Sequence, residues 1–240
     1  MTMTLTKTFQ TLWADFIALL YPRLCLACEK PLPHTEAFIC LACQLNLPQT
    51  DFHKQGNNYF TDKFEGRVPI KAGAALFYFT KMSKTQHLIH QIKYFDKREV
   101  ATELGRFYGE KLAESPYFKN IDVIIPVPLH ARKKILRGYN QAEVFADGLS
   151  ASMHVPIETQ ALEKIKMTES QTRKSNFERL KNTENVYKLT TPSVLKGKNI
   201  LIVDDVMTTG ATLEACALAI LDKAEEVTIS FATIAFAKNG

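Results

Sequence analysis

Two adjacent acids, Asp204 and Asp205, follow an apolar run and precede hydroxyl side chains around one glycine, in the sequence IVDDVMTTGAT. Carboxylates accept hydrogen bonds from sugar hydroxyls. Exposed N–H groups at a helix N-terminus favour an anion, and a glycine lets the backbone approach it closely. The residues that would supply these donors are Thr208, Thr209, Gly210, Ala211 and Thr212. Acceptors for a sugar beside donors for a phosphate predict a site for a ribose 5-phosphate.

The alternative interpretation of this stretch is an ordinary strand-to-helix turn capped by threonines. That interpretation leaves Asp204 and Asp205 unexplained, because two consecutive acids at the end of a buried strand are costly unless something binds them. We therefore favour a ligand site.

Four of the five cysteines form two C-x-x-C pairs, Cys25 with Cys28 and Cys40 with Cys43. Each pair aims two thiolates at one point, so the two pairs together can complete a tetrahedral zinc site that has no open position for catalysis. Disulfides are disfavoured in a reducing cytosol, and a redox dithiol would not need a second pair. The pattern predicts structural Zn²⁺. Cys216 lies in an apolar helical pattern and is predicted to be a small buried side chain.

Basic residues concentrate in two segments of a chain whose net charge is only +5. This charge permits a phosphate-rich ligand or nucleic acid without requiring either. The first cluster contains Arg132, Lys133, Lys134 and Arg137, and the second contains Lys164, Lys166, Arg173, Lys174, Arg179 and Lys181. Either cluster, taken alone, also fits a solvated loop.

Strand-like and helix-like segments alternate through the second part of the chain. The predicted strands are 74–79, 121–127, 186–189, 200–203 and 226–236, and the predicted helices are 85–94, 98–113, 141–153 and 212–223. This alternation predicts an α/β fold with a doubly wound, mostly parallel sheet. Ligands of such sheets bind beyond the carboxyl ends of the strands, where Asp204 and Asp205 are expected.

We expect three regions along the chain: an N-terminal helix and zinc module over residues 1–50, a linker over 51–70 that is rich in Asn, Gln, Gly and Pro, and an α/β domain over 71–240. The apolar residues of 1–21 recur at helical spacing, but Asp15 interrupts the run before it could cross a membrane. We therefore expect a cytoplasmic protein that is not itself transmembrane.

Three stretches resemble the ComF family of competence proteins, which carry a type I phosphoribosyltransferase fold. VDDVMTTGAT is similar to the phosphoribosyl pyrophosphate motif of these transferases. PVPLHARKKILRGYNQAE and KMTESQTRKSNFERLKNTENVY are similar to further ComF signatures, and the four-cysteine finger is also a ComF feature. The resemblance spans about residues 20–236.

The resemblance implies roles for individual residues. Asp204 and Asp205 would accept hydrogen bonds from the ribose in the catalytic centre, and residues 208–212 would hold the 5-phosphate. The first basic cluster, with Arg132, Lys133 and Arg137, would neutralise a pyrophosphate bridged by Mg²⁺. The matching residues of the mobile hood that covers the sugar are Gln171 and Arg179.

The function implied is binding of phosphoribosyl pyrophosphate with Mg²⁺, linked to uptake of single-stranded DNA in natural transformation. One alternative is an active phosphoribosyltransferase with an unidentified nitrogenous acceptor, and another is a regulatory protein that senses phosphoribosyl pyrophosphate. Single-stranded DNA and other competence proteins at the inner membrane face are the partners implied. For stacking on bases, Tyr139 beside Arg137 and Phe177 beside Arg179 are the candidates.

Overall fold

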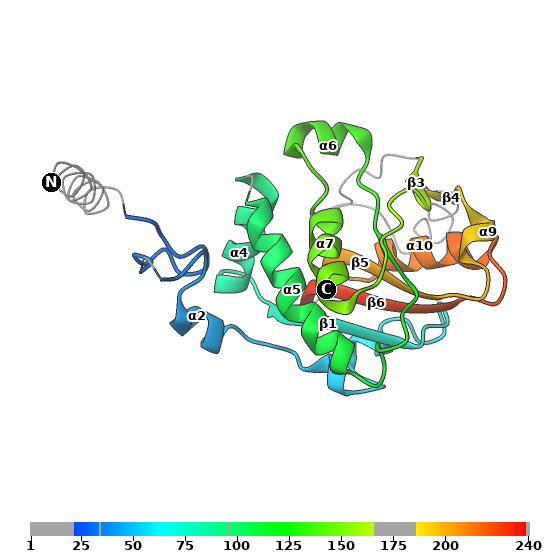
Figure 1. The fold of residues 1–240 in the computed structure, drawn as a ribbon, viewed down its shortest axis with the longest axis horizontal. Coiled ribbons are helices and arrows are strands. Elements are labelled where there is room, and N and C mark those ends of the chain that lie inside the picture. Colours follow the sequence, from blue (N-terminus) through cyan, green and yellow to red (C-terminus); the bar gives the residue numbers. More distant parts are fainter. Residues whose placement is uncertain (1–21, 34, 96, 166–185, 239–240) are drawn as a thin grey trace, which may run out of the picture. The chain divides into compact units, whose positions relative to one another are not determined.

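The computed structural model describes residues 22–33, 35–95, 97–165 and 186–238 (Figure 1). The chain divides into two compact units, Met1–Leu47 and Pro48–Gly240. Within the described part, no helix combines the length and the apolar character that crossing a membrane requires. The predicted N-terminal helix falls outside the described residues.

A four-stranded parallel sheet with strand order β1-β6-β5-β2 organises the second unit. Its strands are β1 (Ala72–Phe79), β2 (Val123–Pro126), β5 (Asn199–Met207) and β6 (Thr228–Ala237). The apolar run from Ile200 to Val203 is fully buried, as a strand covered on both faces requires. The predicted α/β fold with a parallel sheet is confirmed.

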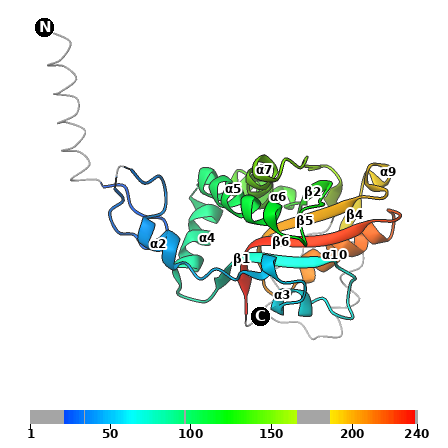
Figure 2. The same cartoon turned by 60° about the horizontal axis from the view of Figure 1, so that its bottom comes forward.

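The longer helices of the described chain that pack around the sheet are α4 (Lys84–Tyr94), α5 (Arg98–Glu114), α7 (Gln141–Met153) and α10 (Ala211–Leu221). Figure 2 shows α5 and α7 on one face of the sheet and α10 on the other. Two of these helices begin where a polar side chain satisfies a free backbone N–H, because Ser83 accepts from Gln86 and Asn140 accepts from Ala142.

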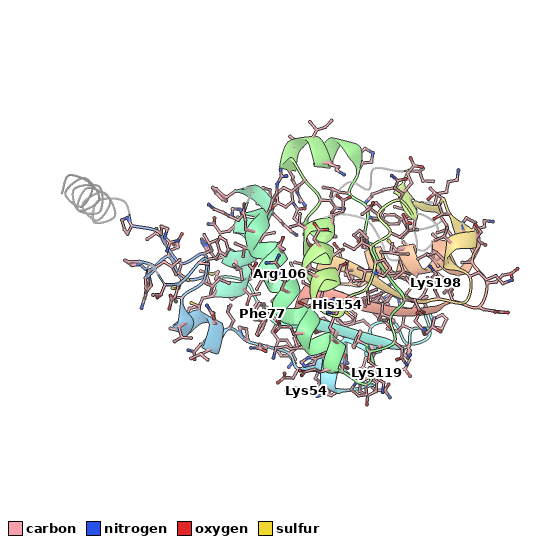
Figure 3. All side chains as sticks on the ribbon, in the orientation of Figure 1. Lys54, Phe77, Arg106, Lys119, His154 and Lys198 are labelled. Atoms are coloured by element: carbon pink, nitrogen blue, oxygen red, sulfur yellow. The ribbon has the colours of Figure 1, made fainter. Side chains whose placement is uncertain are left out.

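Glycines allow α5 and α7 to pack backbone against backbone. A Cβ added at Gly148 would lie 2.1 Å from the carbonyl oxygen of Thr102 and 2.7 Å from the amide nitrogen of Arg106. The Ser152 hydroxyl donates to the Arg106 carbonyl at 3.0 Å across the same contact. Arg106 and His154, the residue after α7, mark the two helices in Figure 3.

Shorter elements complete the described chain. They are α2 (Leu41–Asn46), the 3₁₀ helix η1 (Phe52–Lys54), α3 (Tyr59–Asp62), α6 (Ala131–Arg137), β3 (Leu162–Lys164), β4 (Tyr187–Leu189) and α9 (Pro192–Leu195). The strands β3 and β4 pair as an antiparallel hairpin. The sequence pattern did not predict α6 or β3, because both are too short for a periodic signal.

The structure differs from the predicted linker over 51–70. These residues belong to the second unit, where Phe52, Phe60 and Phe64 are buried. Asn58 caps α3 and also donates to the Gly73 carbonyl at 3.0 Å, which attaches the segment to β1. The polar composition of this segment was misleading, because the segment contributes to the core of the second unit through only a few phenylalanines spaced along it.

Strand β5 is also longer than predicted. It was expected to end at Val203, but pairing with β6 continues through Asp204 opposite Thr233 to Met207 opposite Phe236. The two acids therefore lie within the last part of the strand, and the turn begins after Met207.

Candidate functional site

The turn between β5 and α10 has a shape that glycine permits. Gly210 has φ +80° and forms the N-cap of α10. A Cβ at this position would lie 2.8 Å from Cζ of Phe64, so a side chain would be strained and crowded. Thr208 and Thr209 are exposed, and the Thr209 hydroxyl accepts from the Ala211 amide at 3.4 Å. The turn thus presents hydroxyls at the start of a helix.

Arg67 holds this turn from outside it. Its guanidinium donates to the Glu214 carboxylate in α10 with Nε to Oε1 at 3.1 Å, and a second, shorter contact joins the same two groups. It also donates to the Thr209 carbonyl at 3.1 Å. Sequence reasoning missed Arg67, because it lies in the segment predicted as linker and in no motif.

Asp205 is paired with Lys93, in the last turn of α4. The Lys93 Nζ lies 2.9 Å from Asp205 Oδ2, and the two side chains are 22% and 13% exposed. The neighbouring Asp204 is half-buried, and its Oδ1 accepts from the Asp205 amide at 2.8 Å. Lys93 was not identified from the sequence, since its partner is more than a hundred residues away along the chain.

Burial, and secondly the adjacent Asp205, raise the pKa of Asp204 to about 7. The Asp205 amide and the charges of Lys93 and Lys164 act in the opposite direction. Two carboxylates that are close together and poorly hydrated resist being ionised at once. A cation or hydrogen-bond donors arriving at this pair would favour its ionised form.

The β3–β4 hairpin contributes Lys164 and Tyr187 near the acids. The Lys164 ammonium donates to the Tyr187 hydroxyl at 3.1 Å and also lies 5.1 Å from the centre of its ring. Burial raises the pKa of Tyr187, as do the nearby Cys216 and Asp204. The hairpin therefore flanks Asp204 together with the buried Cys216 of α10.

Arg137 of the first basic cluster contacts α4, the helix that also carries the partner of Asp205. Arg137, at the end of α6, donates to Gln141 at 2.9 Å, and its guanidinium lies 5.6 Å from the ring centre of Tyr94. Tyr94 follows Lys93 directly, so consecutive residues of α4 contact Arg137 and Asp205. Arg132 and Lys133 are in α6, but their side chains are outside the described part, as are Gln171 and Arg179 entirely.

Tyr139 does not have the exposed ring that was predicted for base stacking. It is 5% exposed, its hydroxyl donates to the Ile92 carbonyl, and Arg98 lies 4.7 Å from its ring centre. The prediction was wrong because a tyrosine whose hydroxyl finds a carbonyl is readily buried. Phe177, the other stacking candidate, falls outside the described residues.

The four predicted zinc ligands come together in the first unit. The sulfur atoms of Cys25, Cys28, Cys40 and Cys43 all lie within 4.8 Å of one another. Cys28 Sγ and Cys40 Sγ are 3.8 Å apart, the separation expected in a tetrahedron with Zn–S bonds of about 2.3 Å. The donor set and spacing fit a four-thiolate zinc ion.

The backbone around these cysteines is arranged to support thiolates. Burial alone would raise the pKa of Cys25, but N–H groups of Cys40, Ala27 and Cys28 lower it to about 7. The Cys40 amide donates to Cys25 Sγ at 3.3 Å. Burial raises the pKa of Cys43, as do the neighbouring thiols. A divalent cation would relieve this conflict by stabilising all four thiolates.

The sequence matches the phosphoribosyl transferase domain family over residues 91–240, which is more than half of the chain. The chain therefore belongs to this family. Among curated proteins it is 32% identical over 137 residues to the DNA utilization protein YhgH of Escherichia coli O157:H7, covering 56% of this chain and 60% of the relative. The chain thus spans about three fifths of that relative's length.

Two competence proteins are further homologues. The chain is 34% identical over 113 residues to competence protein ComFC of Bacillus subtilis, covering 47% of this chain and 43% of that protein. It is 34% identical over 93 residues to competence protein F of Haemophilus influenzae, covering 38% and 41%. The resemblance to the ComF family is confirmed by these homologues.

Solved structures show a partial likeness. Adenine phosphoribosyltransferase of Saccharomyces cerevisiae gives a TM-score of 0.39 at 15% identity, covering 60% of this chain and 72% of that one. A hypothetical protein from Neisseria gonorrhoeae with bound ppGpp gives 0.35 at 18% identity, covering 56% and 66%.

Proposed function

We propose that this competence-related protein binds phosphoribosyl pyrophosphate together with Mg²⁺. One observation carries the proposal: two acids and a glycine turn lie together at the end of β5. Asp204 is half-buried and Asp205 is buried, and the turn at Gly210 leads into the N-terminus of α10. In this proposal Asp204 and Asp205 accept the ribose hydroxyls, and residues 208–212 bind the 5-phosphate.

In the same proposal, the first basic cluster binds the pyrophosphate. Arg137, with Arg132 and Lys133 of the same helix, would neutralise its oxygens, and bound Mg²⁺ would supply further charge compensation. When a ribose hydroxyl approaches Asp205, the ion pair between Lys93 and Asp205 must break, or the Asp205 carboxylate must accept from both groups. The raised pKa of Asp204 fits a site that gains from an incoming donor or cation.

Calorimetry with phosphoribosyl pyrophosphate and Mg²⁺ tests this proposal. Asp205→Asn removes one charged acceptor, and we expect at least about tenfold weaker binding, since hydrogen bonds to charged groups contribute roughly 1.5–3 kcal/mol. Asp222→Asn is the matched control, because Asp222 is exposed and, within the described part of the chain, forms an ion pair only with its neighbour Lys223, at 3.0 Å. Equal heats from wild type and Asp205→Asn would count against the site.

Turnover is a separate question that the same ligand can answer. If the protein is a phosphoribosyltransferase, pyrophosphate is displaced at the anomeric carbon by a nitrogen nucleophile, and fixed charges rather than a covalent intermediate stabilise the transition state. Pyrophosphate release that depends on added cell extract would support transfer to an acceptor. Binding without release would favour a sensing or DNA-handling role.

Handling of single-stranded DNA is the second function we propose. The names of the relatives, DNA utilization protein and competence protein, motivate it, and the basic helix α6 gives it a physical basis. Binding of an oligonucleotide should weaken steeply with salt, and replacing Arg132, Lys133 and Arg137 by alanine should flatten that dependence, because fewer counterions are released. An unchanged slope would remove α6 from the interface.

A further inference from the structure

Four of the large apolar side chains that the second unit exposes lie on two short stretches. Tyr94 and Phe95, at the end of α4, are 61% and 55% exposed. Ile135 and Leu136, on α6, are 83% and 85% exposed. Side chains of this size normally leave water when they can, so their concentration indicates a surface that binds something.

The two stretches belong to one surface. The Arg137 guanidinium, which follows Leu136, lies 5.6 Å from the ring centre of Tyr94. Behind them, the Tyr139 hydroxyl donates to the Ile92 carbonyl, and Arg98 donates to the Gly138 carbonyl at 3.4 Å. These contacts hold the end of α6 against the end of α4 and the start of α5.

Aromatic rings gather on this surface beside the guanidinium of Arg137. The ring centres of His90 and Tyr94 are 4.7 Å apart, and those of His90 and Phe95 are 5.7 Å apart. We name His90, Tyr94, Phe95 and Arg137 the ring cluster. The adjoining segments carry both signs of charge: Lys97, Arg98, Lys134 and Arg137 are basic, whereas Asp96, Glu99 and Glu143 are acidic, and Glu143 pairs with Lys134.

We propose that the ring cluster is a stacking platform for the bases of a single-stranded nucleic acid, with the neighbouring cations on its phosphates. This inference rests on the second proposed function and adds to it the surface and the mode of recognition. Exposed rings interleaved with arginine and lysine are the pattern of sequence-tolerant single-strand binding. A duplex would not fit, because its base faces are already stacked.

The position of the ring cluster connects the strand to the candidate ligand site. Tyr94 follows Lys93, which pairs with Asp205 at 2.9 Å. A strand stacked on Tyr94 would therefore lie next to the residue of α4 that pairs with Asp205. Charge alone could attract a strand to α6, whereas stacking requires the rings, and this difference can be measured.

The experiment compares a fluorescein-labelled oligothymidylate with an abasic oligomer of the same length, by fluorescence anisotropy on the full chain. Wild type should prefer the oligothymidylate. A variant with Tyr94→Leu and Phe95→Leu keeps apolar side chains but loses both rings, and it should bind oligothymidylate about tenfold or more weakly while its affinity for the abasic oligomer is unchanged. Tyr94→Trp should retain the preference.

Tyr59→Leu is the matched control. Tyr59 is 60% exposed and has the Lys238 ammonium 5.5 Å from its ring centre, much like Tyr94 beneath Arg137, but it lies on α3. This variant should bind oligothymidylate like wild type. Thermal melting of each variant verifies that it is folded.

The possible results separate the stacking platform from DNA handling itself. Oligothymidylate binding that survives the double leucine change, with the preference over the abasic oligomer intact, overturns the platform and leaves DNA handling standing. Absence of any oligonucleotide binding by wild type overturns both, as would binding only to anionic phosphatidylglycerol vesicles, which would make the surface a membrane contact.

Discussion

The two units of the chain reach their structures by different physical means. Among the described residues of Met1–Leu47, the buried apolar side chains other than cysteines are Ala27, Leu32, Ile39 and Leu47. The second unit buries a network of aromatic rings, including Phe64 and Phe231 with ring centres 4.7 Å apart. The described part of the first unit buries few apolar side chains, so a metal ion held by its four cysteines would contribute much of the order there.

The difference teaches where each unit is vulnerable. If the four thiolates of the first unit hold one cation, loss of a single ligand should affect the whole cluster. The second depends on close packing, so its sensitive positions are those where backbones touch, such as Gly148, and where a turn needs an unusual conformation, such as Gly210.

Removal of zinc should produce the largest effect, and it should be confined to the first unit. Zinc binding contributes on the order of 10 kcal/mol to the folding of such modules. Chelation, or Cys40→Ser, should therefore unfold the first unit, as limited proteolysis would show, and leave the melting of the sheet unit unchanged.

Metal analysis is the companion measurement. The purified protein should contain about one zinc per chain. Cys216→Ala is the control, because Cys216 is buried in α10 of the second unit and is not one of the four clustered cysteines, so this variant should keep its zinc. Markedly less zinc in wild type would contradict a metal-ordered first unit. A fall in the melting temperature of the sheet unit on chelation would contradict the expectation that the effect of zinc is confined to the first unit.

Gly148→Ala should be the most damaging of the packing changes. The added methyl group would meet the Thr102 carbonyl oxygen at 2.1 Å, so α5 and α7 must separate. We expect the free energy of unfolding to fall by about 3 kcal/mol in urea denaturation. Ser152→Ala, which loses one hydrogen bond at the same contact, should cost about 1 kcal/mol. An equal loss of unfolding free energy in Gly148→Ala and Ser152→Ala would contradict the close backbone packing of α5 and α7.

Gly210→Ala should destabilise less and affect ligand binding more. Alanine at φ +80° costs about 1–2 kcal/mol, and its Cβ would also press on the Phe64 ring. Gly197→Ala separates the two causes, because Gly197 has φ +71° but nothing within 4 Å of an added Cβ. We expect weaker binding of phosphoribosyl pyrophosphate in calorimetry for Gly210→Ala only.

Asp204→Asn should have the smallest effect, and its sign depends on pH. With a folded pKa of about 7 against an ordinary value of about 3.9, the native state binds more protons than the unfolded state between these values. Wild-type stability should therefore fall as pH rises through this window. The variant lacks that fall, so at about pH 8 it should be more stable by roughly 1 kcal/mol, or about 2–4 °C in melting temperature.

The same measurement at about pH 5 should bring the two melting temperatures closer, because Asp204 is then protonated in the folded protein. Asp222→Asn, which removes an exposed acid, is the control variant for this comparison. A difference that grows toward low pH would contradict the raised pKa.

The sequence predicted the elements that have a strong period and the motifs that are local. Helix α7 was predicted with its observed bounds, and the four cysteines were predicted to meet because each pair is only three positions apart. The turn around Gly210 was found because its residues are contiguous.

What the sequence could not show are contacts between distant segments. Lys93 and Arg67 reach the site from α4 and from the supposed linker, and no local pattern distinguishes them from solvated residues. The burial of the Tyr139 side chain likewise depends on the carbonyl group of Ile92, which is 47 positions away in the sequence. Such pairings arise from topology, which periodicity does not encode.

The attachment of Arg67 and Phe64 to the turn after β5 sets a limit on how this fold can be recombined. Both residues precede the stretch 91–240 that matches the phosphoribosyl transferase domain family. A chimera joined at residue 91 would inherit the helix N-terminus but neither the ring beneath Gly210 nor the guanidinium on the Thr209 carbonyl. A graft of this domain onto another protein should therefore begin no later than Pro48.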